Sequence, residues 1–461
     1  MPLQVIPASQ RLYSDVLWYL FGYVCLIDPL GSMSVSQVSR LWRGVALFSP
    51  FIWCNITIQL NIATTSQKHL LASAYFKRSK NHPITLTIHT TRPFETWEKK
   101  ELLQPHAHRL SSLHVIASAG HLANLLWMEI NMPMPRLEVF DTVISNYSRI
   151  SFRRNMATIN ENLNIIPPVC HLNVVHWNFW NPTGLTALTL DTTRLWNRPD
   201  LDGIYYALAA TCHTLQHFEY QGRVACFDNE ENTRTCLVFP ALRSLAVLCH
   251  DDMVPLLKLM VIPALDSLSL RDFMVYPAIP TNLVTEPIDI DELTITFDPD
   301  GLFRVIKQWT SIAHLEIIGI GNLFSDDLSP PPELLRYLKS LNQLSSLVLY
   351  GIGAATSIAY TLFMHDPSEE PLLPKLSHFL LAIVEMSPCD DLSQYLITRQ
   401  RHHLPRLQKI SMNFDYILHL SNLNRIDILW DSCDELSIFA DPEFGKHIPV
   451  KVVNLFEKMR C

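Results

Sequence analysis

Apolar residues recur at helical spacing near the start of the chain. Residues 12–24 carry such a series, with side chains four residues apart and two more beside them: Leu12, Val16, Leu20 and Val24, with Leu17 and Phe21. This period predicts an amphipathic helix. Ser14 is a candidate N-cap, and Asp15 suits the positive end of the helix dipole.

A second helix is predicted over residues 34–48. Its apolar side chains fall on one face: Val38, Leu41, Trp42 and Val45. Ser34 or Ser36 is the expected N-cap, and Pro50 ends the helix. Two or three short helices make a module of about forty residues, which buries little surface by itself. Large apolar side chains on such a module predict a docking surface.

Beyond residue 105 the polar and apolar positions repeat as L-x-x-L-x-L. The first positions of this template are Leu110, Leu137, Leu185, Leu215, Leu242, Leu265, Ile290, Ile312, Leu344, Leu376, Leu407 and Cys433. Most steps are 22 to 32 residues, and the step from 137 to 185 spans about two units. Each template predicts a short strand that buries alternate side chains. Leu245, Leu268, Leu315 and Leu347 are therefore expected to be buried.

Helical segments lie between the template strands, at residues 200–212, 301–310, 331–341 and 391–400. One strand and one helix per 20–30 residues resembles the leucine-rich-repeat family. The resemblance implies an α/β solenoid with parallel strands on the concave face and helices on the convex face. The usual Asn or Cys eight residues after the first leucine is missing; the residues found there include Thr193, His250, Phe273 and Ile352. The repeats are thus irregular, and an α/β fold with coincidental leucine spacing is the alternative.

Composition narrows the class of protein. A chain of 461 residues exceeds one compact core and favours several domains or a repeat array. The net charge of −8 argues against a nucleic-acid binder. Ten cysteines without CxxC pairs indicate reduced thiols, and the first residues lack a signal-peptide pattern. The apolar run at 16–27 is too short to cross a bilayer, so we expect a cytoplasmic or nuclear protein without membrane contact.

Candidate chemistry is sparse. The histidine groups at 106–108, 213–217 and 401–403 lack metal-ligand spacing, and the GIG triplets at 319 and 351 lack the third glycine of a dinucleotide fingerprint. The basic run at 77–80 is expected to be a solvated helix end. The sequence therefore predicts no catalytic residues, metal or cofactor. A catalytic domain within an irregular α/β fold remains the alternative.

Residues 12–58 resemble an F-box, in the variety found in large fungal families. The positions that match its two helices and strand are Leu12, Val16, Leu17, Phe21, Val38, Arg40, Trp42, Arg43, Val45, Ala46, Pro50, Trp53, Ile56 and Ile58. Tyr13 replaces the usual proline and Ser39 the usual cysteine. Residues 75–91 resemble the helix, basic turn and threonine-rich strand that follow in this family.

The resemblance implies a non-catalytic substrate receptor that docks on the Skp adaptor of a cullin–RING (SCF-type) ubiquitin ligase. The implied adaptor-binding residues are Leu12, Val16, Leu17, Leu20, Phe21, Val38, Leu41, Trp42, Arg43 and Trp53. The expected domains are an F-box-like domain at 1–58, a linking helix and strand at 59–104 that form the first unit of the array, and a repeat domain at 105–461 that binds an unidentified target protein. An interaction scaffold that does not engage a ligase is the alternative function.

Overall fold

The computed structural model describes residues 13–28, 30–60, 65–92, 103–117, 134, 136–144, 169–172, 185–191, 201–222, 235–249, 253–272, 299–318, 332–350, 354–363, 365–366, 369–382, 389–413, 428–429 and 431–439. The fold is mixed α/β with parallel strands. It divides into two compact units, Met1–Arg194 (unit 1) and Leu195–Cys461 (unit 2).

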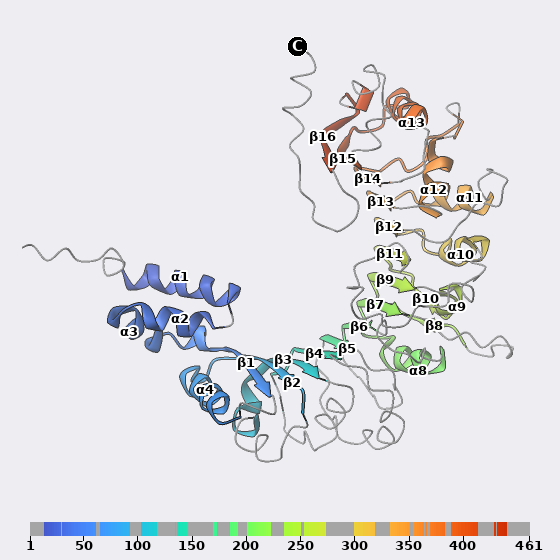
Figure 1. The fold of residues 1–461 in the computed structure, drawn as a ribbon. Helices are drawn as coiled ribbons and strands as arrows, with labels where there is room; N and C mark the ends of the chain where they lie inside the picture. Colours follow the sequence, from blue (N-terminus) through green and yellow to red (C-terminus); the bar gives the residue numbers. More distant parts are fainter. Residues whose placement is uncertain are drawn as a thin grey trace, which may run out of the picture. The chain divides into compact units, whose positions relative to one another are not determined.

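Unit 1 begins with helices and continues with strands (Figure 1). The helical elements are α1 (Ser14–Ile27), α2 (Gly31–Val38), α3 (Arg40–Phe48), the 3-10 helix η2 (Pro50–Trp53), α4 (Thr65–Arg78) and the 3-10 helix η4 (Gln104–Arg109). The strands are β1 (Asn55–Leu60), β2 (Ile84–Thr90), β3 (Leu110–Ala117), β4 (Val139–Ile144), β5 (Val169–Leu172) and β6 (Ala187–Asp191). Each strand pairs in parallel with the next one along the chain.

The prediction of a single helix over residues 34–48 is wrong, because the helix is interrupted at Ser39. Ser39 has extended backbone angles, and its hydroxyl accepts a hydrogen bond from the backbone N–H of Trp42 at 3.1 Å. It therefore caps α3, in the role expected of Ser34 or Ser36. Ser14 is not an N-cap either: Tyr13 occupies that position of α1, without a side-chain hydrogen bond.

Unit 2 alternates strands and helices. Its helices are α8 (Leu201–Thr211), α9 (Val254–Lys258), α10 (Pro299–Ile306), α11 (Pro332–Ser340), α12 (Ala354–Phe363) and α13 (Cys389–Arg401). Its strands are β7 (His217–Gly222), β8 (Leu237–Val238), β9 (Ser244–Cys249), β10 (Met260–Val261), β11 (Ser267–Asp272), β12 (His314–Ile318), β13 (Ser346–Tyr350), β14 (His378–Ala382), β15 (Leu407–Asn413) and β16 (Cys433–Phe439). The four predicted helices thus correspond to α8, α10, α11 and α13.

The long strands of unit 2 form one parallel ladder in the order β7-β9-β11-β12-β13-β14-β15-β16. They lie one above another, with α9 to α12 along one side (Figure 1). The predicted burial is confirmed. Four leucines lie in register on adjacent strands and are at most 1% exposed: Leu245, Leu268, Leu315 and Leu347. Such a row of leucines fills the space between strands and helices.

One template does not contribute to the ladder as expected. The unit at Ile290 predicted a strand between those that begin near 267 and 314, yet β11 pairs directly with β12. Ile290 itself lies outside the described residues, as do the turn positions Thr193, His250, Phe273 and Ile352. The spacing of apolar residues alone could not reveal which strands are neighbours.

Candidate functional site

The helices of unit 1 are organised around one buried tryptophan. Trp53 is fully buried, and its indole Nε1 donates a hydrogen bond to the backbone carbonyl of Ala46 at 2.8 Å. The ring of Tyr75 meets it edge-on with centroids 5.1 Å apart. Trp53 therefore joins η2 to both α3 and α4.

The basic run at 77–80 is only partly solvated. The Arg78 guanidinium lies 4.3 Å from the centroid of the Trp53 ring, which is cation–π geometry. Ser79 is fully buried, and its hydroxyl donates to the carbonyl of Phe76 at 3.0 Å. The expected solvated helix end is thus wrong for these two residues, while Lys77 and Lys80 are exposed.

Helix α1 has apolar side chains on two faces. Leu17 and Phe21 are fully buried, and the Phe21 ring lies 5.2 Å from that of Trp42 on α3. A second set of apolar side chains remains exposed by 37% to 84%: Val16, Tyr19, Leu20, Tyr23 and Ile27. These five residues, named here the α1 row, recur at steps of three and four and so form one stripe along the helix.

A second exposed apolar group lies at the end of α2 and along α3. Val38 is 53% exposed, Leu41 44% and Phe48 79%. Gly44 lies between the latter two on the helix, and a Cβ built on it would meet no atom within 4 Å. We name Leu41, Gly44 and Phe48 the α3 row. The missing side chain leaves a low point at which another molecule can approach the helix backbone closely.

The predicted adaptor-binding residues divide by burial. Those with exposed side chains are Val16, Leu20, Val38, Leu41 and Arg43; Trp42 is half-buried; Leu17, Phe21 and Trp53 are fully buried. The fully buried residues are covered by the unit itself, so their role is to build it. Leu12 lies outside the described residues.

Four members of the α1 and α3 rows were absent from the predicted adaptor-binding residues: Tyr19, Tyr23, Ile27 and Phe48. The signal was present, because residues 16, 20, 23 and 27 keep helical spacing beside the series that includes Leu17 and Phe21. Two overlapping apolar series cannot be assigned to core or surface by period alone.

Charged and titratable groups of this region have structural roles. Arg43 Nε donates to the carbonyl of Ser36 at 3.1 Å and so connects α3 to α2. Burial, together with the charge of Asp28, raises the pKa of Cys25 to about 11. Burial likewise raises the pKa of Cys54 to about 11, against the opposing effect of Arg109. Both thiols stay protonated at neutral pH, which makes them poor nucleophiles.

A Ser–His–Asp chain crosses strands β3 and β4. The Ser112 hydroxyl lies 2.8 Å from Nε2 of His114, and Nδ1 of His114 lies 3.1 Å from Oδ2 of Asp141. The sequence did not reveal it, because register places His114 opposite Asp141. A hydrolytic triad also needs donors aimed at an oxyanion. Here the strands on both sides of β3 engage its backbone in the ladder, so we assign no catalytic role to Ser112, His114 and Asp141.

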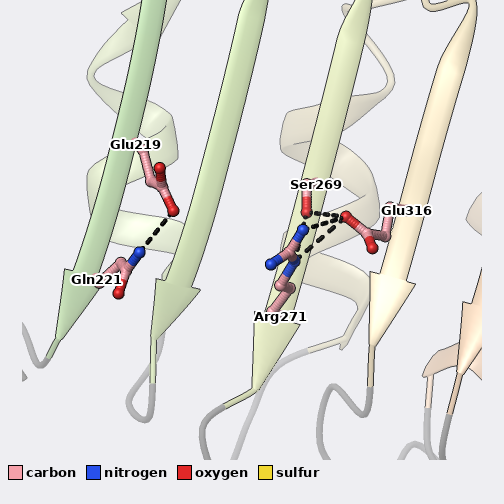
Figure 2. A network of polar contacts seen from close by, with 5 residues as sticks. All are labelled: Glu219, Gln221, Ser269, Arg271 and Glu316. Carbon is pink, nitrogen blue, oxygen red and sulfur yellow. Dashed lines mark hydrogen bonds and ion pairs between the residues drawn. The ribbon is translucent and has the colours of Figure 1, made fainter. Parts of the chain in front are cut away.

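A second polar network lies on the sheet of unit 2 (Figure 2). Oε2 of Glu316 accepts hydrogen bonds from Arg271 Nη2 at 2.7 Å, from Arg271 Nε at 3.2 Å and from the hydroxyl of Ser269. Two strands further along the ladder, Oε1 of Glu219 accepts from Gln221 Nε2 at 2.6 Å. The network ties β11 to β12 and leaves polar groups at the surface of the sheet.

In the part of the chain that the structure describes, no three His, Cys, Asp or Glu side chains are grouped to hold a metal ion. None of the helices in that part is long and apolar enough to cross a membrane. Comparison with models of known protein families gave no match to this chain, and comparison with curated proteins gave none either.

Proposed function

We propose that this protein is a non-catalytic substrate receptor of a cullin–RING ubiquitin ligase. The helices α1 to α3 act as an F-box-like module that docks on a Skp-type adaptor. The later strand–helix units act as an irregular leucine-rich-repeat-like solenoid that binds a target protein. Ubiquitin transfer is carried out by the other subunits, so the receptor contributes proximity and orientation.

One observation carries the proposal: the α1 row and the α3 row expose large apolar side chains, although each helix also buries residues on another face, Leu17 and Phe21 on α1 and Ala46 on α3. A surface helix needs only one apolar stripe to pack against its own domain, so a second apolar stripe is not required for folding. Exposed contiguous apolar surface is typical of a site for another macromolecule. Tyrosines, which supply two members of the α1 row, are enriched at the centres of protein interfaces.

The alternative is an interaction scaffold that uses the same helices for another partner and does not engage a ligase. Tyr13 in place of the family's proline favours it, since this residue precedes α1 and is 81% exposed. The two functions differ in whether the adaptor binds.

The test is a calorimetric titration of the full chain with a purified Skp adaptor. We expect binding that is lost in Gly44→Arg, because the long charged side chain fills the low point of the α3 row. Gly44→Ala is the matched control and keeps binding, since a methyl group adds little height. No binding by the wild-type chain, or equal binding by both variants, contradicts adaptor docking through α3.

A further inference from the structure

The ladder of unit 2 presents one row of side chains on the face opposite the buried leucines. Strand register defines it from β7 to β16: Glu219, Ala246, Ser269, Glu316, Val348, Leu380, Ser411 and Ser437. We name this row and its neighbours along each strand the open face. Figure 1 shows α10 to α12 along one side of these strands, and the buried leucines occupy that side, so the open face lies on the other side.

The first half of the open face carries an unbalanced negative charge. Glu316 is neutralised by Arg271, whose Nη2 lies 2.7 Å from its carboxylate. Glu219 makes no ion pair with any of the described residues; its hydrogen bond comes from the neutral amide of Gln221. The adjacent row position holds Ala246, which is half-buried and carries only a methyl group.

The middle of the open face is apolar. Val348 and Leu380 are half-buried neighbours in the row, and Tyr350 lies beside them, paired with the buried Ile318. Beyond them, Lys409 Nζ meets Oε1 of Glu435 at 2.7 Å, and this exposed pair satisfies its own charges. An apolar centre with self-satisfied polar groups at its edges has the composition of a protein-recognition site.

We propose that the open face binds an extended peptide segment of the target protein, with a Lys or Arg beside Glu219 and an aliphatic side chain on Val348 and Leu380. The basic group lies over Ala246, where it supplies the missing positive charge. This proposal rests on the proposed function, because it specifies the kind of target that the receptor holds.

The spacing of the two side chains follows from strand geometry. Ala246 and Val348 are three strands apart in the ladder, or about 14 Å at about 4.8 Å per strand. A peptide that crosses the strands advances about 3.3 Å per residue, so the two side chains are about four residues apart. Residues i and i+4 of an extended chain point to the same side, as simultaneous contact requires.

The experiment is a selection of random twelve-residue peptides displayed on phage against the immobilised full chain. We expect enrichment of peptides with a basic residue and an aliphatic residue four positions apart. Glu219→Lys should replace the basic preference by an acidic one. Val348→Ser should retain the basic preference and lose the aliphatic one. Glu435→Gln is the control on the same face and should leave both unchanged, since Glu435 is already paired with Lys409.

A synthetic peptide from the selection then gives the affinity. Glu219→Gln, which is nearly isosteric, should weaken its binding about threefold to tenfold. The absence of any enriched peptide on the wild-type protein would overturn the proposal. That result is also expected if another part of the chain or a second copy of the protein covers the open face. A preference that survives in Glu219→Lys would overturn it too. Titration of the same preparations with the adaptor separates the two proposals, because that binding uses α1 to α3.

Discussion

The guanidinium of Arg78 lies 4.3 Å from the centre of the Trp53 ring. Arg78 ends α4, and Trp53 ends η2, so the contact joins the N-terminal helices to the helix that packs beside β1. Trp53 is also held by its hydrogen bond to Ala46 on α3. A single side chain thereby couples three elements of unit 1.

Trp53→Ala should destabilise unit 1 by about 3–5 kcal/mol, because it leaves a large cavity at this junction. Denaturant unfolding followed by circular dichroism measures the effect. Trp18→Ala is the matched control: Trp18 is 49% exposed, and its ring and that of Phe51 lie edge-to-face at 6.1 Å between ring centroids. Its cost should be about 1 kcal/mol. Equal losses for the two variants would show that Trp53 does not hold the elements together.

The glycines of α2 and α3 should respond in opposite directions to the same substitution. A Cβ on Gly44 meets open space, so Gly44→Ala should stabilise the protein by about 0.5–1 kcal/mol through helix propensity. A Cβ on Gly31 would lie 2.9 Å from the carbonyl oxygen of Val24, so Gly31→Ala should destabilise it by about 1–3 kcal/mol. Thermal unfolding of both variants measures these changes in stability. Destabilisation by Gly44→Ala would contradict the open space assigned to Gly44.

The two faces of α1 should separate binding from folding. Tyr19→Ser combined with Tyr23→Ser changes only exposed side chains, so stability should change by about 1 kcal/mol or less. Adaptor affinity should fall about tenfold or more if these tyrosines are interface anchors. Leu17→Ala should instead cost about 2–5 kcal/mol of stability, since Leu17 is fully buried. An unchanged adaptor affinity in the tyrosine variant would remove the α1 row from the interface.

His106 should make unit 1 sensitive to mild acid. Its ring stacks on Phe76 with centroids 4.4 Å apart, and Arg109 Nη2 lies 3.1 Å from its Nδ1. Burial, together with Arg109 and His108, lowers the pKa of His106 from 6.5 to about 4. Below pH 6.5 the unfolded chain takes up a proton that the folded chain does not. The contribution of His106 to the free energy of unfolding is therefore fully present above pH 6.5 and is lost as the pH falls towards 4.

His106→Asn tests this pH dependence, because an amide oxygen can accept from Arg109 and does not titrate. The variant should lose less of its unfolding free energy than the wild type between pH 6.5 and 4. His82→Asn changes an exposed histidine elsewhere in unit 1 and should follow the wild-type profile. Parallel profiles for wild type and His106→Asn would exclude His106 as the source.

Strand positions were the most predictable part of the fold. The template leucines of β9, β11, β12 and β13 are buried, and two of the helices between these strands, α10 and α11, form at predicted segments, whereas α9 was not predicted. Each of these elements is specified by side chains within a few residues of one another, which the sequence displays directly. The direct pairing of β11 with β12 was not predictable, because a template repeat does not say whether its segment joins the ladder.

The predicted adaptor-binding residues differ in burial, which the sequence did not show. Within residues 12–58, which resemble an F-box, Leu17, Phe21 and Trp53 are buried while Tyr19, Tyr23 and Phe48 are exposed. Helical period identifies apolar stripes, yet only packing against a neighbouring helix selects which stripe becomes core.

Register, too, depends on tertiary structure. It places Glu316 beside Ser269 and Arg271, residues 45 and more positions away along the chain. Local sequence thus determined which segments are helices and strands, because propensity and period act over short distances. The tertiary structure decided which apolar and charged side chains remain for a partner, because burial and pairing depend on neighbours distant in sequence.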